Sequence, residues 1–142
     1  MKRKYLIGAA VVILAAVWLA FFAPHRLFRA DANVRYIRCE YYSEAHGEYL
    51  DLTAEQAAEV VAILQPLWCF RVWGESSRSL DEMVLEITLF VDGQPLYVVL
   101  GRRDYCYSGT HGPFQQFEII GGDKATEQIL ALLGLDEERI NG

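Results

Sequence analysis

Residues 84–101 read VLEITLFVDGQPLYVVLG and carry the strongest structural signal in this chain of 142 residues. Aliphatic side chains alternate there with Glu86 and Thr88, which is the period of a strand with one buried face. Asp92-Gly93 supplies the two residues of a type I′ turn, and residues 96–100 return as a strand that is apolar on both faces. The stretch therefore predicts a β-hairpin whose second strand lies in the interior of a sheet.

Further strands and two helices are predicted on both sides of this hairpin. Segments rich in β-branched and aromatic residues precede it at 34–42, 48–52 and 68–73, and follow it at 105–108 and 114–120. Helical spacing of apolar residues and a capping box of Thr53 and Gln56 mark 54–64 as a helix. A last helix is expected to start with Asp123 as its cap and to end near Gly134.

This order of elements predicts an α+β domain of two layers, with an antiparallel meander sheet of about five strands and two helices. The connecting turns are too short for parallel neighbours. In the first strand, we expect Ile37, Cys39 and Tyr41 to share the buried face. The segment 34–142 is long enough to bury a core without the support of a metal or a disulfide.

A separate hydrophobic segment stands at the N-terminus. Residues 5–23, YLIGAAVVILAAVWLAFFA, contain no charge and, as a helix, nearly match a hydrocarbon layer of ~30 Å. Lys2, Arg3 and Lys4 precede the segment and keep the N-terminus in the cytoplasm by the positive-inside rule. We therefore expect 1–4 as a cytoplasmic N-terminus, 5–23 as a transmembrane helix, 24–33 as a connector and 34–142 as an extracytoplasmic domain.

A secretory signal peptide is the alternative for the same segment. Ala30-Asp31-Ala32 would then be the cleavage site, and the protein would be secreted after cleavage. The apolar run is longer than a usual signal-peptide core, and two arginines separate it from that site, which favours a retained anchor in the cell membrane. No cysteine ends the apolar run, so lipid attachment of the lipoprotein type is not expected.

The charge of the chain is distributed unevenly. Residues 1–32 carry five of the 13 Lys and Arg but one of the 19 Asp and Glu. The remainder of the chain is therefore strongly acidic and repels phosphate groups. This excludes nucleic acid as a partner and argues strongly against docking of the folded domain on an anionic lipid surface.

The three cysteines, Cys39, Cys69 and Cys106, lie in predicted strands and lack the spacing of a zinc site or a thioredoxin-type motif. Free thiols buried in the core are the first interpretation. The alternative in an oxidising compartment is a disulfide between Cys39 and Cys69 or between Cys69 and Cys106, with one cysteine left over. The sequence predicts no metal site and no cofactor.

The sequence favours a protein without enzymatic activity. His25, His46 and His111 do not share a spacing that would bind a metal on one element. Cys106 and His111 are the one candidate pair for a small cell-envelope hydrolase or redox enzyme, although a strand cysteine and a solvated loop histidine are the simpler interpretation. The chain contains no Gly-x-Ser-x-Gly, no His-Glu-x-x-His and no phosphate-binding loop.

Residues 105–117, YCYSGTHGPFQQF, combine aromatic residues, glycines and a proline at a hairpin. Such a loop can present Tyr105, Tyr107, His111 and Phe114 to a ligand or partner. The ordinary alternative is a hairpin whose aromatic side chains cover the sheet. Together with the anchor, the loop predicts a binding or interaction module that holds another envelope protein or a small ligand near the membrane surface.

The layout resembles the small membrane-anchored or lipoprotein-type extracytoplasmic α+β domains of bacteria. The resemblance lies in LTAEQAAEVVAIL at 52–64, VLEITLFVDGQPLYVVLG at 84–101 and FEIIGG at 117–122, about a third of the exported part. No activity is established for that group, so the resemblance implies the anchor and the fold and assigns no site residue.

Overall fold

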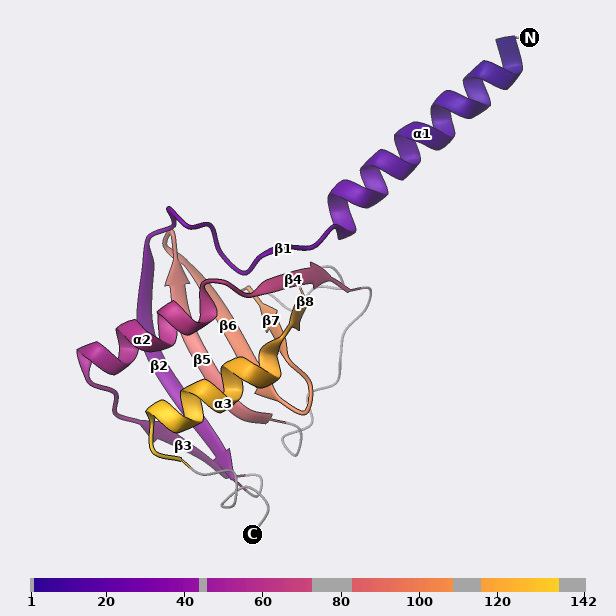
Figure 1. Ribbon diagram of the computed structural model, residues 1–142. Coiled ribbons are helices and arrows are strands. Elements are labelled where there is room, and N and C mark those ends of the chain that lie inside the picture. The colour runs from indigo at the N-terminus through magenta and orange to yellow at the C-terminus, as the bar shows by residue number, and fades with distance from the viewer. Residues whose placement is uncertain (1, 44–45, 73–82, 109–115, 136–142) are drawn as a thin grey trace.

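The computed structural model describes residues 2–43, 46–72, 83–108 and 116–135 and shows an N-terminal helix joined to an α+β domain (Figure 1). The helices are α1 (Lys2–Phe22), α2 (Ala54–Leu64) and α3 (Gly122–Leu132). The strands are β1 (His25–Arg26), β2 (Val34–Ser43), β3 (His46–Leu50), β4 (Trp68–Arg71), β5 (Met83–Val91), β6 (Gln94–Gly101), β7 (Tyr105–Tyr107) and β8 (Gln116–Ile120).

All the strands belong to one antiparallel sheet with the order β1-β4-β8-β7-β6-β5-β2-β3. The predicted α+β class and antiparallel pairing are confirmed, but the sheet has eight strands rather than about five. A meander from β5 to β8 forms its centre. The β2–β3 hairpin extends the sheet beyond β5, and β4 with β1 extends it beyond β8, because each edge of the meander offers unpaired backbone groups.

The predicted hairpin of β5 and β6 forms the middle of the sheet. Asp92 and Gly93 have φ of 50° and 79°, the two positive values that a type I′ turn requires. The turn is tied to the start of β2, because the Asn33 N–H donates to Asp92 Oδ1 at 2.9 Å and the Asp92 N–H donates to the Asn33 carbonyl at 2.9 Å. β6 lies between β5 and β7, as an interior strand should.

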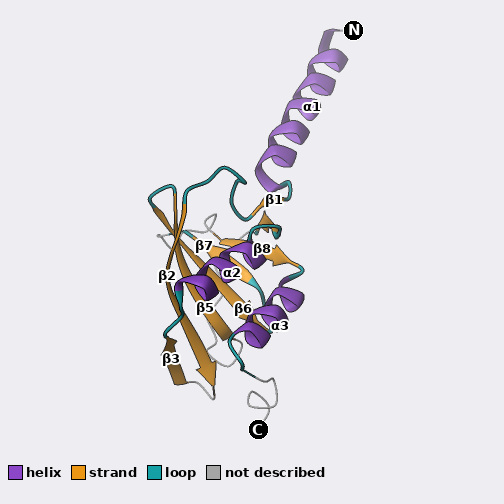
Figure 2. Cartoon of the chain, turned by 60° about the vertical axis from the view of Figure 1, so that its left-hand side comes forward, coloured by secondary structure: helices purple, strands orange, loops and turns teal. Residues whose placement is uncertain are grey.

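Both domain helices cover the same face of the sheet, so the domain has two layers (Figure 2). Val60 and Leu64 of α2 and Ile129 of α3 pack in the main core cluster with Ile87 and Leu89 of β5. All five side chains have an exposed fraction of 0%. The aliphatic half of the β5 alternation therefore faces the helices, as its pattern predicts.

One position of β2 departs from the expected pattern. The pairing of β2 with β5 shifts register between Tyr36 and Arg38, which is the signature of a β-bulge. Cys39 and Tyr41 are buried as predicted, but Ile37 is 38% exposed and Tyr36 packs against the core in its place. The prediction for Ile37 is wrong because the extra residue of the bulge interrupts the alternation of faces.

The two domain helices begin in different ways. α2 starts after the predicted capping box, in which the Gln56 N–H donates to Thr53 Oγ1 at 3.2 Å and the Thr53 N–H donates to Gln56 Oε1 at 3.0 Å. α3 starts after Gly121, which has a φ of 76° and receives no side-chain capping hydrogen bond. The prediction that Asp123 caps this helix is therefore wrong. Asp123 lies in the first turn, where its charge still favours the helix dipole.

The end of α3 follows the prediction. Gly134 has a φ of 67°, its N–H donates to the Ala131 carbonyl at 3.2 Å, and the Leu135 N–H donates to the Leu130 carbonyl at 2.9 Å. This pair of bonds is a Schellman motif, which needs a residue that adopts a positive φ without strain.

α1 stands outside the domain and every one of its residues is at least partly exposed. It is the one helix among the described residues that is long and apolar enough to cross a membrane, a property that signal sequences share. The predicted connector 24–33 is partly structured, because β1 lies within it and pairs with β4. Only two residues, Ala23 and Pro24, therefore lie between the end of α1 and the start of the sheet.

Candidate functional site

The residues predicted to contact a ligand divide into two groups. Tyr105 and Tyr107 lie on β7, whereas His111 and Phe114 fall outside the described residues. Both tyrosines are 7% exposed and face away from α2 and α3, where they cluster with Tyr42 and Tyr97. The aromatic side chains thus cover the sheet, which is the ordinary alternative that the sequence left open.

Aromatic contacts organise this second cluster. The rings of Tyr97 and Tyr107 stack with centroids 4.8 Å apart and an interplanar angle of 17°. Tyr105 lies farther along, with its centroid 6.3 Å from that of Tyr107. We refer to this side of the sheet as the tyrosine face, defined by Glu40, Tyr42, Tyr49, Glu86, Tyr97, Tyr105 and Tyr107.

Two carboxyl groups lie next to each other on the tyrosine face. Glu40 is the register partner of Tyr49 on one side and of Glu86 on the other, so all three side chains project from the same side of the sheet. Burial raises the pKa of Tyr42, and the charges of Glu86 and Glu40 and a hydrogen bond from the Tyr42 hydroxyl to Glu40 raise it further. Aromatic rings beside carboxylates favour a cationic group as the ligand.

The cysteines lie on the opposite, helix-covered side of the sheet. Cys39, Cys69 and Cys106 are free thiols with exposed fractions of at most 1%. Burial raises the pKa of Cys39 to about 12, with the charge of Glu40 adding to the shift. The thiols of Cys69 and Cys106 are hydrogen-bonded, which lowers the pKa of Cys69 and raises that of Cys106.

A histidine that the sequence did not single out as a partner lies beside this thiol pair. His25 Nδ1 is 3.6 Å from Cys69 Sγ and 2.8 Å from the Arg26 carbonyl oxygen. The carbonyl oxygen is only an acceptor, so the contact with Arg26 assigns the ring hydrogen to Nδ1. His25 comes from β1, a strand of two residues in a segment that the sequence presents as a connector, so no pattern indicated its position.

The sheet order limits which cysteines a disulfide can join. Cys69 on β4 and Cys106 on β7 are separated by β8, so their Cα atoms are roughly 10 Å apart. A disulfide needs ~4.4–6.8 Å between these atoms, and a Cys69–Cys106 bridge therefore requires backbone movement. Cys39 on β2 is three strands from Cys106 and farther from Cys69. The predicted disulfide stays a prediction.

Metal-binding clusters and pockets are the remaining candidates for a functional site. Among the residues that the structure describes, no group of three or more His, Cys, Asp and Glu side chains is arranged to hold a metal ion. A pocket of about 340 Å³ beside the β5–β6 turn is lined by Asn33, Arg35, Phe90 and Gly93. The Arg35 guanidinium lies 5.2 Å from the centroid of the Phe90 ring that forms its wall.

Comparison of the chain with family models, with curated proteins and with solved structures finds no match.

Proposed function

We propose that this protein is a membrane-anchored binding module whose domain lies outside the cytoplasm and holds a partner on its tyrosine face. Neighbouring carboxyl groups of Glu40 and Glu86 beside stacked tyrosines carry the proposal. The partner is another envelope protein or a small ligand that presents a cationic group to this face. An uncovered apolar helix of 21 residues, α1, supports the membrane anchor.

The location of the domain is tested by labelling single introduced cysteines on intact cells. Glu127→Cys, at an exposed position of α3, should react with a membrane-impermeant maleimide, and Lys2→Cys should react only after lysis. The native cysteines give little background because each is at most 1% exposed. The reverse pattern contradicts the proposed orientation, and a mature protein that lacks residues 1–32 contradicts the anchor.

The binding surface is tested by photo-crosslinking in cell membranes. A photoreactive residue at Tyr49, which is 62% exposed on the tyrosine face, should give a discrete adduct. The same residue at Glu127, on the helix-covered side, is the matched control and should give none. Glu40→Gln should abolish the adduct at Tyr49, since it removes the charge that attracts a cationic partner. Equal adducts at both positions, or none at Tyr49, contradict the proposal.

Thiol redox chemistry is a second candidate, favoured by the hydrogen bond between Cys69 and Cys106 and by His25 beside them. The Cys69 thiolate would attack one sulfur of a partner disulfide and release one partner thiol. After backbone movement that brings the two cysteines within disulfide distance, Cys106 would attack Cys69 Sγ, closing the Cys69–Cys106 disulfide and releasing the second partner thiol. The sequence alone suggested Cys106 and His111 for this role, and His111 lies outside the described part of the chain.

Thiol counting by maleimide mass shift tests this role after incubation with oxidised glutathione. A redox pair predicts that two thiols are lost and that Cys39 remains, because Cys39 on β2 is three strands from Cys106 and farther from Cys69. Cys39→Ser should then leave the same two-thiol loss. Retention of all three thiols contradicts the redox candidate.

A further inference from the structure

Three side chains from neighbouring strands form a row at the edge of the sheet nearest α1. Register pairs Arg26 of β1 with Trp68 of β4, and Trp68 with Ile120 of β8. Trp68 is 44% exposed and Ile120 is 48% exposed, although both belong to residue types that usually lie inside. The Arg26 guanidinium lies 5.3 Å from the centroid of the Trp68 ring. We call Arg26, Trp68 and Ile120 the edge row.

The edge row is held close to the end of α1 by two connections. Only Ala23 and Pro24 separate α1 from β1, and the three Cα–Cα steps from Phe22 to His25 span at most ~11 Å. The neighbouring strand β4 lies about 4.8 Å farther. In addition, the Arg71 guanidinium at the end of β4 lies 4.1 Å from the centroid of the Phe21 ring on α1. The side chains of the edge row therefore cannot move far from the place where α1 leaves the hydrocarbon.

The length of α1 brings this edge to the membrane surface. The uncharged run 5–23 is roughly 28 Å long as a helix, slightly shorter than a hydrocarbon core of ~30 Å. Each headgroup layer adds about 5–8 Å on its side. With the connection above, β1 and β4 fall within or against the headgroup layer on the side of the membrane where the domain lies.

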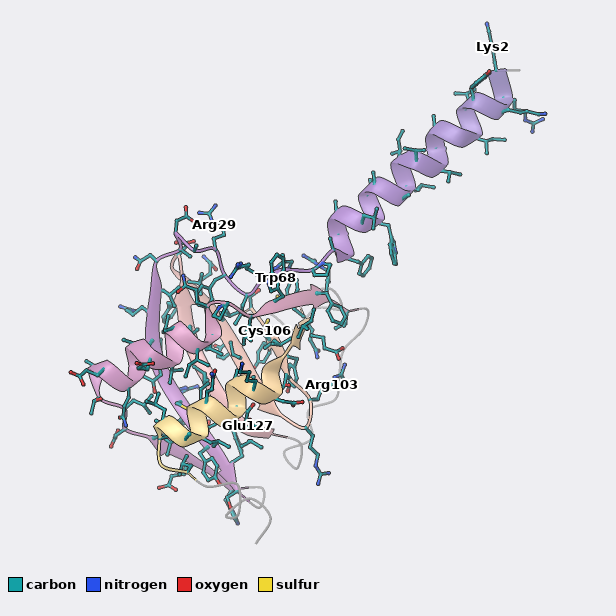
Figure 3. All side chains as sticks on the ribbon, viewed as in Figure 1. Lys2, Arg29, Trp68, Arg103, Cys106 and Glu127 are labelled. Atoms are coloured by element: carbon teal, nitrogen blue, oxygen red, sulfur yellow. The ribbon has the colours of Figure 1, made fainter. Side chains whose placement is uncertain are left out.

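The composition of the edge matches that layer. Trp is enriched at membrane interfaces, where its ring sits among the headgroups, and Arg pairs with phosphate oxygens. Two arginines, Arg26 and Arg29, and one aspartate occur in residues 24–33, the segment that contains β1, whereas most of the acidic side chains lie farther along the chain. Figure 3 places Arg29 and Trp68 at the end of the domain near α1, and Glu127 farther from it.

We propose that the edge row seats the domain on the outer surface of the bilayer, with Trp68 and Ile120 among the lipid headgroups and Arg26 against lipid phosphate. The inference rests on the proposed membrane anchor and adds that the domain lies against the lipid instead of standing free on its connector. A zwitterionic phospholipid carries no net charge, so its surface does not repel the acidic domain, and the phosphate contact is made by Arg26 of the basic segment 1–32.

Fluorescence quenching of single-tryptophan variants of the full chain in nanodiscs tests this inference. Phe replaces two of Trp18, Trp68 and Trp73 at a time, and the lipid is phosphatidylcholine with a bromine or nitroxide quencher near the headgroup. The variant that keeps only Trp68 should emit at a shorter wavelength than the control variant and should be quenched by the headgroup label. The matched control is Tyr49→Trp with all three native tryptophans replaced, because position 49 lies on β3 at the far edge of the sheet.

The outcomes separate the two proposals. Quenching of Trp18 with an acyl-chain quencher reports insertion of α1, and its absence would contradict the anchor itself. Quenching of Trp18 together with a Trp68 signal no stronger than that of Tyr49→Trp would overturn the seating alone. If the seating is correct, Ile120→Asp should reduce headgroup quenching of Trp68 to the level of the Tyr49→Trp control. Unchanged circular dichroism of this variant would show that the domain still folds.

Discussion

The two faces of the sheet bury their side chains by different means. On the helix-covered face, aliphatic residues such as Leu85, Ile87 and Leu89 are 0% exposed beneath α2 and α3. On the opposite side, which carries the tyrosine face, Glu86 and Thr88 of the same strand have exposed fractions of 8% and 6%. An aliphatic side chain is stable in any close-packed site, but a buried polar group needs a partner for each of its polar atoms. Stability therefore resides mainly on the first face and specific chemistry on the second.

The largest expected effect on the free energy of unfolding comes from a cavity in the helix-covered face. Ile87→Ala should lower the free energy of unfolding by about 2–5 kcal/mol, because it leaves a cavity at the centre of the core. Urea unfolding of the full chain in detergent micelles measures this change. Thr88→Ala, one residue along the same strand, is the control and should cost less than half as much. Equal losses at both positions would show that the two faces contribute alike to stability.

The helix-covered face was also the part that the sequence predicted best. The β5 alternation, the Asp92-Gly93 turn and the α2 capping box are local patterns, so each could be identified within a window of a few residues. The eight-strand sheet could not be predicted, because short strands such as β1 become strands only through the partner that they meet. The bulge at Ile37 could not be predicted for the same reason, since register is set by the neighbouring strand.

The second effect concerns how α3 is seated on that face. Gly122 begins α3 directly against the Asp104 carboxyl group, and a Cβ at this position would overlap the carboxyl atoms. Gly122→Ala should therefore lower the free energy of unfolding by roughly 1–3 kcal/mol. Lys124→Ala, at an exposed position in the same helix, should stay within about 0.5 kcal/mol of the native value. A neutral Gly122→Ala would show that Asp104 moves aside without cost.

The candidate site was predicted only in part, and the reason is physical. Aromatic composition drew attention to Tyr105 and Tyr107 as a group, but composition does not state which face of a strand is covered. Glu40 lies far from them along the chain, and only the register of β2 against β5 places it beside Glu86. His25 beside Cys69 depends in the same way on pairing between β1 and β4. Long-range register leaves no trace in a single sequence.

A smaller effect of opposite sign is expected on the tyrosine face. Among the described residues, the buried Thr88 hydroxyl has no hydrogen-bond partner. Thr88→Val keeps the shape and removes the unsatisfied oxygen, so it should raise the free energy of unfolding by about 1 kcal/mol. The same urea experiment measures it, with Thr126→Val as the contrasting control, because the Thr126 hydroxyl donates to the Gly122 carbonyl at 2.9 Å. Destabilisation by Thr88→Val would contradict this account of the face.

The smallest effect is a pH dependence at Asp104, where α3 meets the end of β6. Burial raises the pKa of this carboxyl group above its ordinary value of 3.8, while a hydrogen bond from the Gly101 N–H at 3.0 Å opposes the shift. The folded protein therefore binds the proton more tightly than the unfolded chain does, so Asp104 favours folding most below pH 3.8. This contribution is lost as the pH rises through the folded-state pKa.

Asp104→Asn removes the titration and keeps the shape of the side chain. The stability of the native protein relative to this variant should therefore be greatest near pH 3.5 and should fall as the pH rises toward 7, with urea unfolding as the measurement. Asp51→Asn is the matched control, because the Asp51 side chain is exposed, and it should show no such trend. A difference that grows with rising pH would mean that the Gly101 N–H and the start of α3 stabilise the charged form more than burial penalises it, and α3 would then depend on Asp104 as an ionised cap.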